Sequence, residues 1–198
     1  MSETPLPKAA PGSFIADPAP LGLGAFALTT FVLSVVNTDM VKAEPVVFGL
    51  ALAYGGLAQF AAGMWEFAKG NTFGGTAFTS YGAFWISFWY LTGHTDMTGI
   101  NADDAAHQVG LYLLAWGIFT AYMSVAATRV SGAVLAVFVL LTLTFLALAW
   151  GKFAGSDGIT HLGGYLGLLT AVAAFYASFA GVAAFTFGSQ IAPVGPRE

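Results

Sequence analysis

Polar side chains inside long apolar stretches are the groups in this chain whose types could do chemistry. They are hydroxyl and amide groups, at Thr29, Thr30, Asn37, Gln59, Thr79 and Ser80. Such groups form hydrogen bonds with a carboxylate or an undissociated acid without holding it tightly, which suits passage of a solute more than its storage. We therefore expect them to line a solute pathway, although many helical hydroxyls bond to their own backbone instead.

Several other chemistries are excluded by missing residues. The chain has no cysteine, which removes disulfides, thiolate metal sites and cysteine nucleophiles. It also lacks the His-Glu-x-x-His pattern of a metalloprotease and a lysine in the middle of a late apolar stretch, where a retinal protein needs one. We expect neither an enzyme nor a resident metal or cofactor. We also expect no buried carboxylate, and hence no fixed proton relay.

The start of the first apolar stretch has an unusual local sequence. Its residues are Asp17, Pro18, Ala19, Pro20, Leu21, Gly22 and Leu23. Asp is a good N-cap and proline is tolerated in the first turn, so a helix is expected to begin here. The amide donors and the dipole of that helix start could attract an anion at a pore entrance. The alternative is a plain helix start with an acidic cap.

The elements that must position these groups are membrane-spanning helices. Hydrophobic residues make up 57% of the chain and charged residues only 8%, against about 25% charged in soluble domains. Six intervals lack Lys, Arg, Asp and Glu: Pro18–Thr38, Pro45–Trp65, Gly70–Thr95, Ala105–Thr128, Val130–Gly151 and Gly158–Pro196. A crossing needs roughly 20 apolar residues. The sequence therefore predicts an all-α membrane protein with six transmembrane helices.

The charges that remain indicate how the helices lie in the membrane. We expect residues 1–16 to form a flexible cytoplasmic tail, 17–190 the six-helix domain, and 191–198 a second cytoplasmic tail. With both termini inside, the cytoplasmic side carries Lys8, Lys69, Arg129 and Arg197. That excess of positive charge favours this orientation, and the simplest location is a prokaryotic cytoplasmic membrane. A faint likeness between the two halves suggests two inverted three-helix repeats.

The segment 17–23 resembles the Asn-Pro-Ala-Pro-Leu-Gly-Leu signature of the acetate uptake transporter family, which includes the bacterial succinate-acetate permeases. The likeness continues through 55–59, 69–74, 76–82 and 84–85, and reaches 116–120 and His161. It covers all six predicted spans in order. One departure is Asp17, where the family has Asn; this puts a negative charge near the route of an anion.

The resemblance implies a homohexamer in the lipid bilayer, with a pathway in each subunit for acetate and succinate and with proton coupling in some members. It also implies a hydrophobic constriction at Phe26, Tyr81 and Leu141. We expect a channel or proton-coupled carrier for small monocarboxylates, and no nucleic-acid partner. The alternatives are a neutral-solute pore for ammonia or urea, and a sensory or structural membrane protein that does not transport.

Overall fold

The computed structural model describes residues 14–42 and 45–195. Most of the expected N-terminal tail and residues 196–198 lie outside this described part. Within it, the helices are α1 (Ala19–Asn37), α2 (Pro45–Leu52), the π-helical segment η1 (Ala53–Ala58), α3 (Gln59–Lys69), α4 (Thr72–Gly93), α5 (Ala102–Ala127), α6 (Gly132–Ala154) and α7 (Asp157–Phe187). Because α2, η1 and α3 are continuous, the described chain forms six rods.

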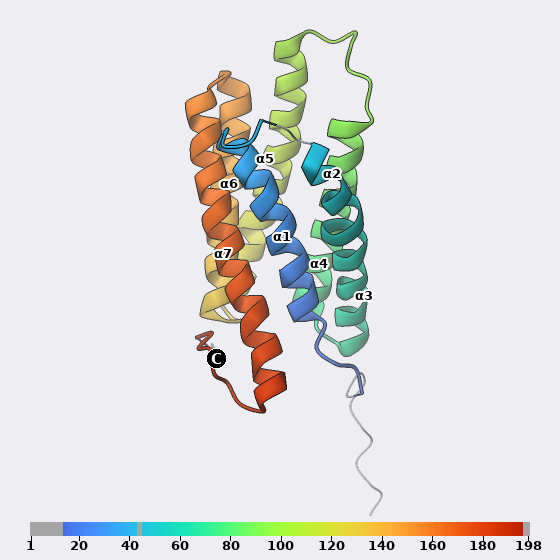
Figure 1. The fold of residues 1–198 in the computed structure, drawn as a ribbon, viewed down its shortest axis with the longest axis vertical. Coiled ribbons are helices and arrows are strands. Elements are labelled where there is room, and N and C mark those ends of the chain that lie inside the picture. The colour runs from blue at the N-terminus through green and yellow to red at the C-terminus, as the bar shows by residue number, and fades with distance from the viewer. Residues whose placement is uncertain (1–13, 43–44, 196–198) are drawn as a thin grey trace, which may run out of the picture.

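The rods lie side by side in one bundle (Figure 1). α1 packs against α7 on one side and against the rod of α2, η1 and α3 on the other. α6 lies between α7 and α5, and α4 packs on the second rod. Aromatic side chains close the remaining side between α4 and α5, where the Phe84 and Tyr112 rings stack with centroids 5.6 Å apart.

The helix ends follow from local sequence. The side chains of Asn71, Asn101, Ser131 and Ser156 each accept a hydrogen bond from the backbone N–H three residues later, and so cap α4, α5, α6 and α7. α3 and α6 end at Gly70 and Gly155, whose φ values of 91° and 58° lie in the left-handed region that glycine adopts without strain.

Several predicted span boundaries were wrong, and two of them bear on the site. The second rod does not end at Trp65 but continues to Lys69, so that Glu66 is helical. The sixth predicted span ran to Pro196, whereas α7 ends at Phe187 and the chain turns at Gly188. The later segment then packs on the start of α6, where Gly132 N–H donates to the Gly195 carbonyl at 2.7 Å. The uncharged intervals therefore located the apolar regions correctly, but their limits are not the ends of the helices.

The surface of the bundle suits a lipid environment. Five rods are long and apolar enough to cross a membrane, by length and composition: α1, Pro45–Lys69, α5, α6 and α7. α4 is not among them, although its 22 residues carry no charge, because its Gly, Thr, Ser and Tyr residues lower its mean hydropathy. The all-helical fold class is thus confirmed for the described residues.

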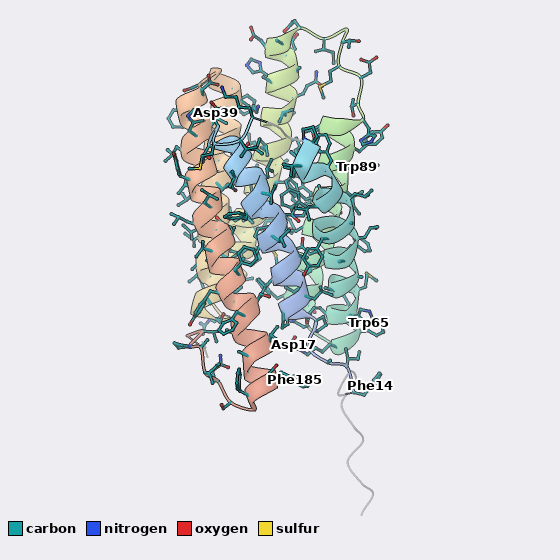
Figure 2. All side chains as sticks on the ribbon, viewed as in Figure 1. Phe14, Asp17, Asp39, Trp65, Trp89 and Phe185 are labelled. Atoms are coloured by element: carbon teal, nitrogen blue, oxygen red, sulfur yellow. The ribbon has the colours of Figure 1, made fainter. Side chains whose placement is uncertain are left out.

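The residues labelled in Figure 2 identify the two ends of the bundle. Asp17 lies at one end, together with Trp65 and Phe185, and Asp39 lies at the other, with Trp89 nearer to that end. We call these the Asp17 end and the Asp39 end. The start of α1 and the end of the described C-terminal segment both lie at the Asp17 end (Figure 1).

Candidate functional site

The three residues expected to form a constriction come together between the rods. Phe26 of α1, Tyr81 of α4 and Leu141 of α6 are 3%, 3% and 4% exposed. They line one cavity of about 20 Å³, and the Phe26 and Tyr81 ring centroids are 5.5 Å apart. A cavity of this size holds about one water molecule. The interior is therefore nearly closed at this level.

Tyr81 is held in place from the α5 side. Its hydroxyl lies 2.9 Å from Oγ1 of Thr120. The Thr120 hydroxyl donates its own hydrogen to the Trp116 carbonyl at 2.7 Å, so Tyr81 is the donor to Thr120. The ring also meets Phe119 edge-on at 5.5 Å. Neither Thr120 nor Phe119 was among the predicted site residues.

Gln59 is the residue with an amide group at the constriction. It follows η1 directly and lines the same small cavity. The side chain is 1% exposed, yet neither its Oε1 nor its Nε2 has a hydrogen-bond partner. Leaving buried polar atoms unpaired costs about 1–3 kcal/mol. An amide left in this state can both donate to and accept from a group that enters the cavity.

The π-helical segment brings Gln59 to this position through close helix packing. A side chain at Gly55 would collide with Thr29 of α1, and one at Gly56 would collide with the Ala51 carbonyl. α1 and η1 can therefore approach closely only because glycine stands there. A single π turn inside an α-helix is frequent at functional sites.

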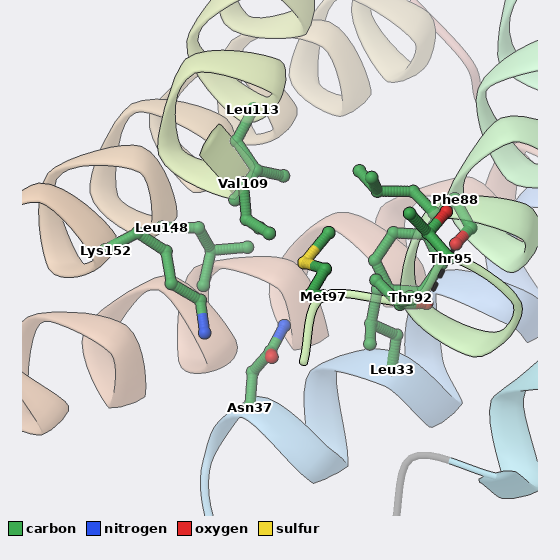
Figure 3. A pocket seen from close by; sticks show the side chains of 11 residues that line it. Leu33, Asn37, Phe88, Thr92, Thr95, Met97, Val109, Leu113, Leu148 and Lys152 are labelled. Atoms are coloured by element: carbon green, nitrogen blue, oxygen red, sulfur yellow. Dashed lines mark hydrogen bonds between the residues drawn. The ribbon is translucent and has the colours of Figure 1, made fainter. Parts of the chain in front are cut away.

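A larger cavity of about 310 Å³ lies at the Asp39 end (Figure 3). The amide of Asn37, the ammonium of Lys152 and the hydroxyl of Thr92 contribute polar groups to its wall, together with the thioether of Met97. Asn37 was expected on the pathway, but Lys152 was assigned only to a connection. Lys152 lies in the last turn of α6, and this position allows its side chain to point into the bundle.

The segment 17–23 mainly docks α1. Asp17 was expected to be the N-cap, but Pro18 occupies that position. The Asp17 carboxylate instead accepts the Ala19 N–H at 3.2 Å and pairs with the Lys69 ammonium at 2.8 Å. The N-cap therefore lies one residue later than expected. The Asp17 carboxylate forms an ion pair with Lys69 instead.

The rest of this segment contacts its neighbours in two ways. The Pro20 carbonyl accepts a hydrogen bond from Ser178 of α7 at 2.6 Å, and Gly22 lies so close to the Phe78 ring that a side chain would collide. Leu23 lines the constriction cavity. Leu21 is exposed and lies on a separate groove with Asp17 and Pro20.

The other expected pathway residues are scattered. Thr29 is buried but donates to the Ala25 carbonyl of its own helix at 3.0 Å. The hydroxyl oxygens of Thr30 and Thr79 are buried without a partner. Ser80 and His161 are partly exposed and line neither the constriction cavity nor the larger cavity. The structure therefore does not bring all the predicted residues to one site.

The expectation that no carboxylate is buried was wrong. Glu66 is 0% exposed. The sequence does hold a signal for it, since Glu66 follows Gln59 by seven residues, which places both on one face of a helix, with Gly63 between them. The predicted span ended at Trp65 because spans were defined as intervals without charged residues. Glu66 was therefore left outside the span.

Comparison with protein families gives a match over residues 3–194 to the GPR1/FUN34/yaaH family. The chain is 38% identical over 183 residues to the succinate-acetate/proton symporter SatP of Escherichia coli, covering 91% of this chain and 96% of that protein. It is 43% identical to acetate permease A of Emericella nidulans, over 90% of this chain and 65% of the permease.

A yeast relative carries a different name. The chain is 44% identical to ammonia transport outward protein 2 of Saccharomyces cerevisiae, over 88% of this chain and 64% of that protein. This chain therefore spans slightly less than two thirds of the length of these fungal relatives.

Among solved structures, that of the bacterial acetate channel SatP matches with a TM-score of 0.84 and 37% identity, covering 91% of this chain and 99% of that one. The resemblance predicted from the sequence is confirmed by these matches. The chain belongs to the GPR1/FUN34/yaaH family.

Proposed function

We propose that this chain is a membrane channel or proton-coupled carrier for acetate and similar small monocarboxylates, including succinate. The observation that carries the proposal is the small apolar cavity between the rods, where Phe26, Tyr81 and Leu141 meet beside Gln59, whose amide is buried without a partner. The names of the SatP and acetate permease relatives support the same class of solute.

The geometry suggests how a carboxylate would pass. The Lys152 ammonium in the Asp39-end cavity attracts an anion. The constriction then excludes bulk water through its aromatic and leucine side chains. A bare anion is destabilised in such an apolar place, whereas an undissociated acid is much less so. The Gln59 amide can pair with a carboxylic acid by donating to its carbonyl oxygen and accepting from its hydroxyl.

We further propose six membrane spans, with α4 as the third, both termini in the cytoplasm of a prokaryotic cell, and a homohexameric assembly. The 22-residue length of α4 supports the sixth span, because roughly 20 residues cross the hydrocarbon core. The common position of the described chain ends at the Asp17 end is what an even number of crossings requires.

The test is uptake of labelled acetate into proteoliposomes, with and without an imposed pH gradient, compared with protein-free liposomes. Saturable acetate uptake above the protein-free rate is the expected result. Uptake equal to that of protein-free liposomes would contradict the proposal and favour a sensory or structural protein.

The yeast relative named for ammonia transport makes a neutral-solute pore the second candidate. Competition separates the two. If the pathway takes carboxylates, propionate slows labelled acetate uptake while ammonia and urea do not. Urea or ammonia flux above the protein-free rate, with no effect of propionate, would support the neutral-solute pore instead.

A further inference from the structure

Glu66 is a buried titratable group that the pathway described above does not use. It lies in the last turns of α3, and its side chain is 0% exposed. Oε2 accepts a hydrogen bond from the Asn71 amide at 2.8 Å, while Oε1 is buried with no partner. On the other side the carboxyl group lies against α4, since a side chain at Gly74 would come within 3.0 Å of its Cδ.

Among the described residues, no cation forms an ion pair with Glu66. Lys69 follows on the same helix, but its ammonium is paired with Asp17 at the start of α1, at 2.8 Å. The start of α4 faces Glu66 with the uncharged residues Asn71 and Gly74. Within the described part of the chain, no Lys, Arg or His forms an ion pair with the Glu66 carboxylate.

Two opposing effects make both charge states of Glu66 accessible. Burial without a cation disfavours the carboxylate. The Asn71 amide, which also caps α4 by accepting the Gly74 N–H at 3.1 Å, stabilises the carboxylate by donating to it. The positive end of the α4 dipole acts in the same direction. A group balanced in this way is suited to bind and release a proton.

Glu66 is connected to the constriction by its position on α3. Gln59 lies seven residues earlier, two helical turns away on the same face, at a rise of about 1.5 Å per residue. Between them is Gly63, and the unpartnered Thr79 hydroxyl of α4 lies directly over it. The Thr79 hydroxyl therefore lies along the distance of about 10 Å that separates Glu66 from Gln59.

We propose that Glu66 is the proton-binding residue that links carboxylate passage to protons in this chain. The inference rests on the proposed function. In the ionised state, the Glu66 charge repels a carboxylate that reaches Gln59 before it has taken up its own proton, through a medium of low dielectric constant. Binding of a proton from water at the Asp17 end forms an O–H bond on the carboxylate and removes this repulsion. Once the solute has left, that bond breaks and the proton returns to water.

The experiment compares wild type with Glu66→Gln in acetate counterflow, with equal acetate and equal pH on both sides of the proteoliposome. Gln keeps the acceptor for Asn71 but cannot titrate. Rates are corrected for protein-free liposomes, and the wild-type rate is divided by the Glu66→Gln rate at each pH. This division cancels the titration of acetate itself.

We expect the wild-type to Glu66→Gln ratio to fall as the pH is raised, by up to about tenfold per pH unit, because the protonated fraction of a titrating group changes by up to that factor. Asp157→Asn, which removes an exposed carboxylate at the start of α7, should show the wild-type profile. Glu66→Asp keeps a titratable carboxyl group, so its acetate flux should still depend on pH as in wild type. This variant provides the test if Glu66→Gln does not fold.

A ratio that is constant with pH, or a Glu66→Asp profile without pH dependence, would overturn the inference and leave Glu66 as an acceptor for Asn71 only. Those outcomes leave the proposed function intact if wild type transports acetate. If wild type shows no acetate flux at any pH, the proposed function fails and this inference fails with it.

Discussion

The constriction and the Asp39-end cavity both lie between the helices, but they differ in volume and in the polarity of their walls. The constriction holds about 20 Å³, and its lining surface is apolar. The Asp39-end cavity holds about 310 Å³ and offers an ammonium, an amide and hydroxyl groups. A wide polar cavity can collect hydrated anions, and a narrow apolar one can exclude them. Under the proposed function, we therefore expect capture in the wide region and selection in the narrow one.

The largest effect is expected from Tyr81→Ala, which removes the ring that contacts Phe26, Phe119 and Phe138. Loss of a buried aromatic side chain costs about 3–5 kcal/mol. The widened constriction should also pass butyrate nearly as well as acetate. Thermal unfolding in detergent and the ratio of labelled acetate to butyrate flux measure the two effects.

The control for this change is Tyr81→Phe, which keeps the ring and removes only the bond to Thr120. It should cost about 1 kcal/mol and leave the acetate to butyrate ratio near its wild-type value. If Tyr81→Ala and wild type discriminated equally between the two acids, selection would not take place at this constriction.

A smaller effect on transport is expected for Gln59→Met, and this change should raise the stability where Tyr81→Ala lowers it. The change removes two unpartnered buried polar atoms and keeps a similar volume, so stability should rise by about 1–3 kcal/mol. Acetate flux should nevertheless fall by about tenfold, which corresponds to a loss of about 1.4 kcal/mol of interaction with the passing acid. Unfolding and flux are measured on the same preparation. Unchanged flux would mean that the amide does not meet the solute.

The smallest effect is expected in the wide cavity. Lys152→Gln removes the positive charge from its wall and should raise the half-saturating acetate concentration about two- to fivefold, in line with the 1 kcal/mol or less that accessible charge interactions contribute. The maximal rate should not change, because the constriction is untouched. Added salt should reproduce the effect in wild type.

Lys42→Gln is the matched control, since Lys42 lies at the same end but pairs with Asp39 at 3.7 Å and is absent from the cavity wall. Equal shifts in the two variants would show that general surface charge, and not this cavity, attracts the anion.

The sequence was sufficient to predict a helical membrane protein and to select three residues that meet at one small cavity, and the two predictions had different grounds. Uncharged stretches of sufficient length determine the helices, because a membrane leaves few alternatives. Phe26 and Leu141 carry no signal of their own in apolar helices, and only the family resemblance selected them. The structure places both beside Tyr81.

The features that were missed depend on contacts between helices. The π-helical segment at Ala53–Ala58 follows from the approach of α1 to Gly55, which local sequence does not reveal. Burial of Glu66 requires the start of α4 to fold over it. Lys152 looked like a loop residue because charge was used to define the span ends. Charges in the last turn of a helix are poorly classified by that rule.

The central claim is that carboxylates pass through the constriction, and the absence of cysteine from the chain allows a direct test. In Leu141→Cys, a small thiol-reactive reagent should attach to the new side chain and block labelled acetate flux in proteoliposomes. Leu143→Cys, on the exposed face of the same helix, should keep its flux under the same treatment. Mass spectrometry measures the labelled fraction. Complete labelling of Leu141→Cys with acetate flux at the unlabelled rate would contradict the claim.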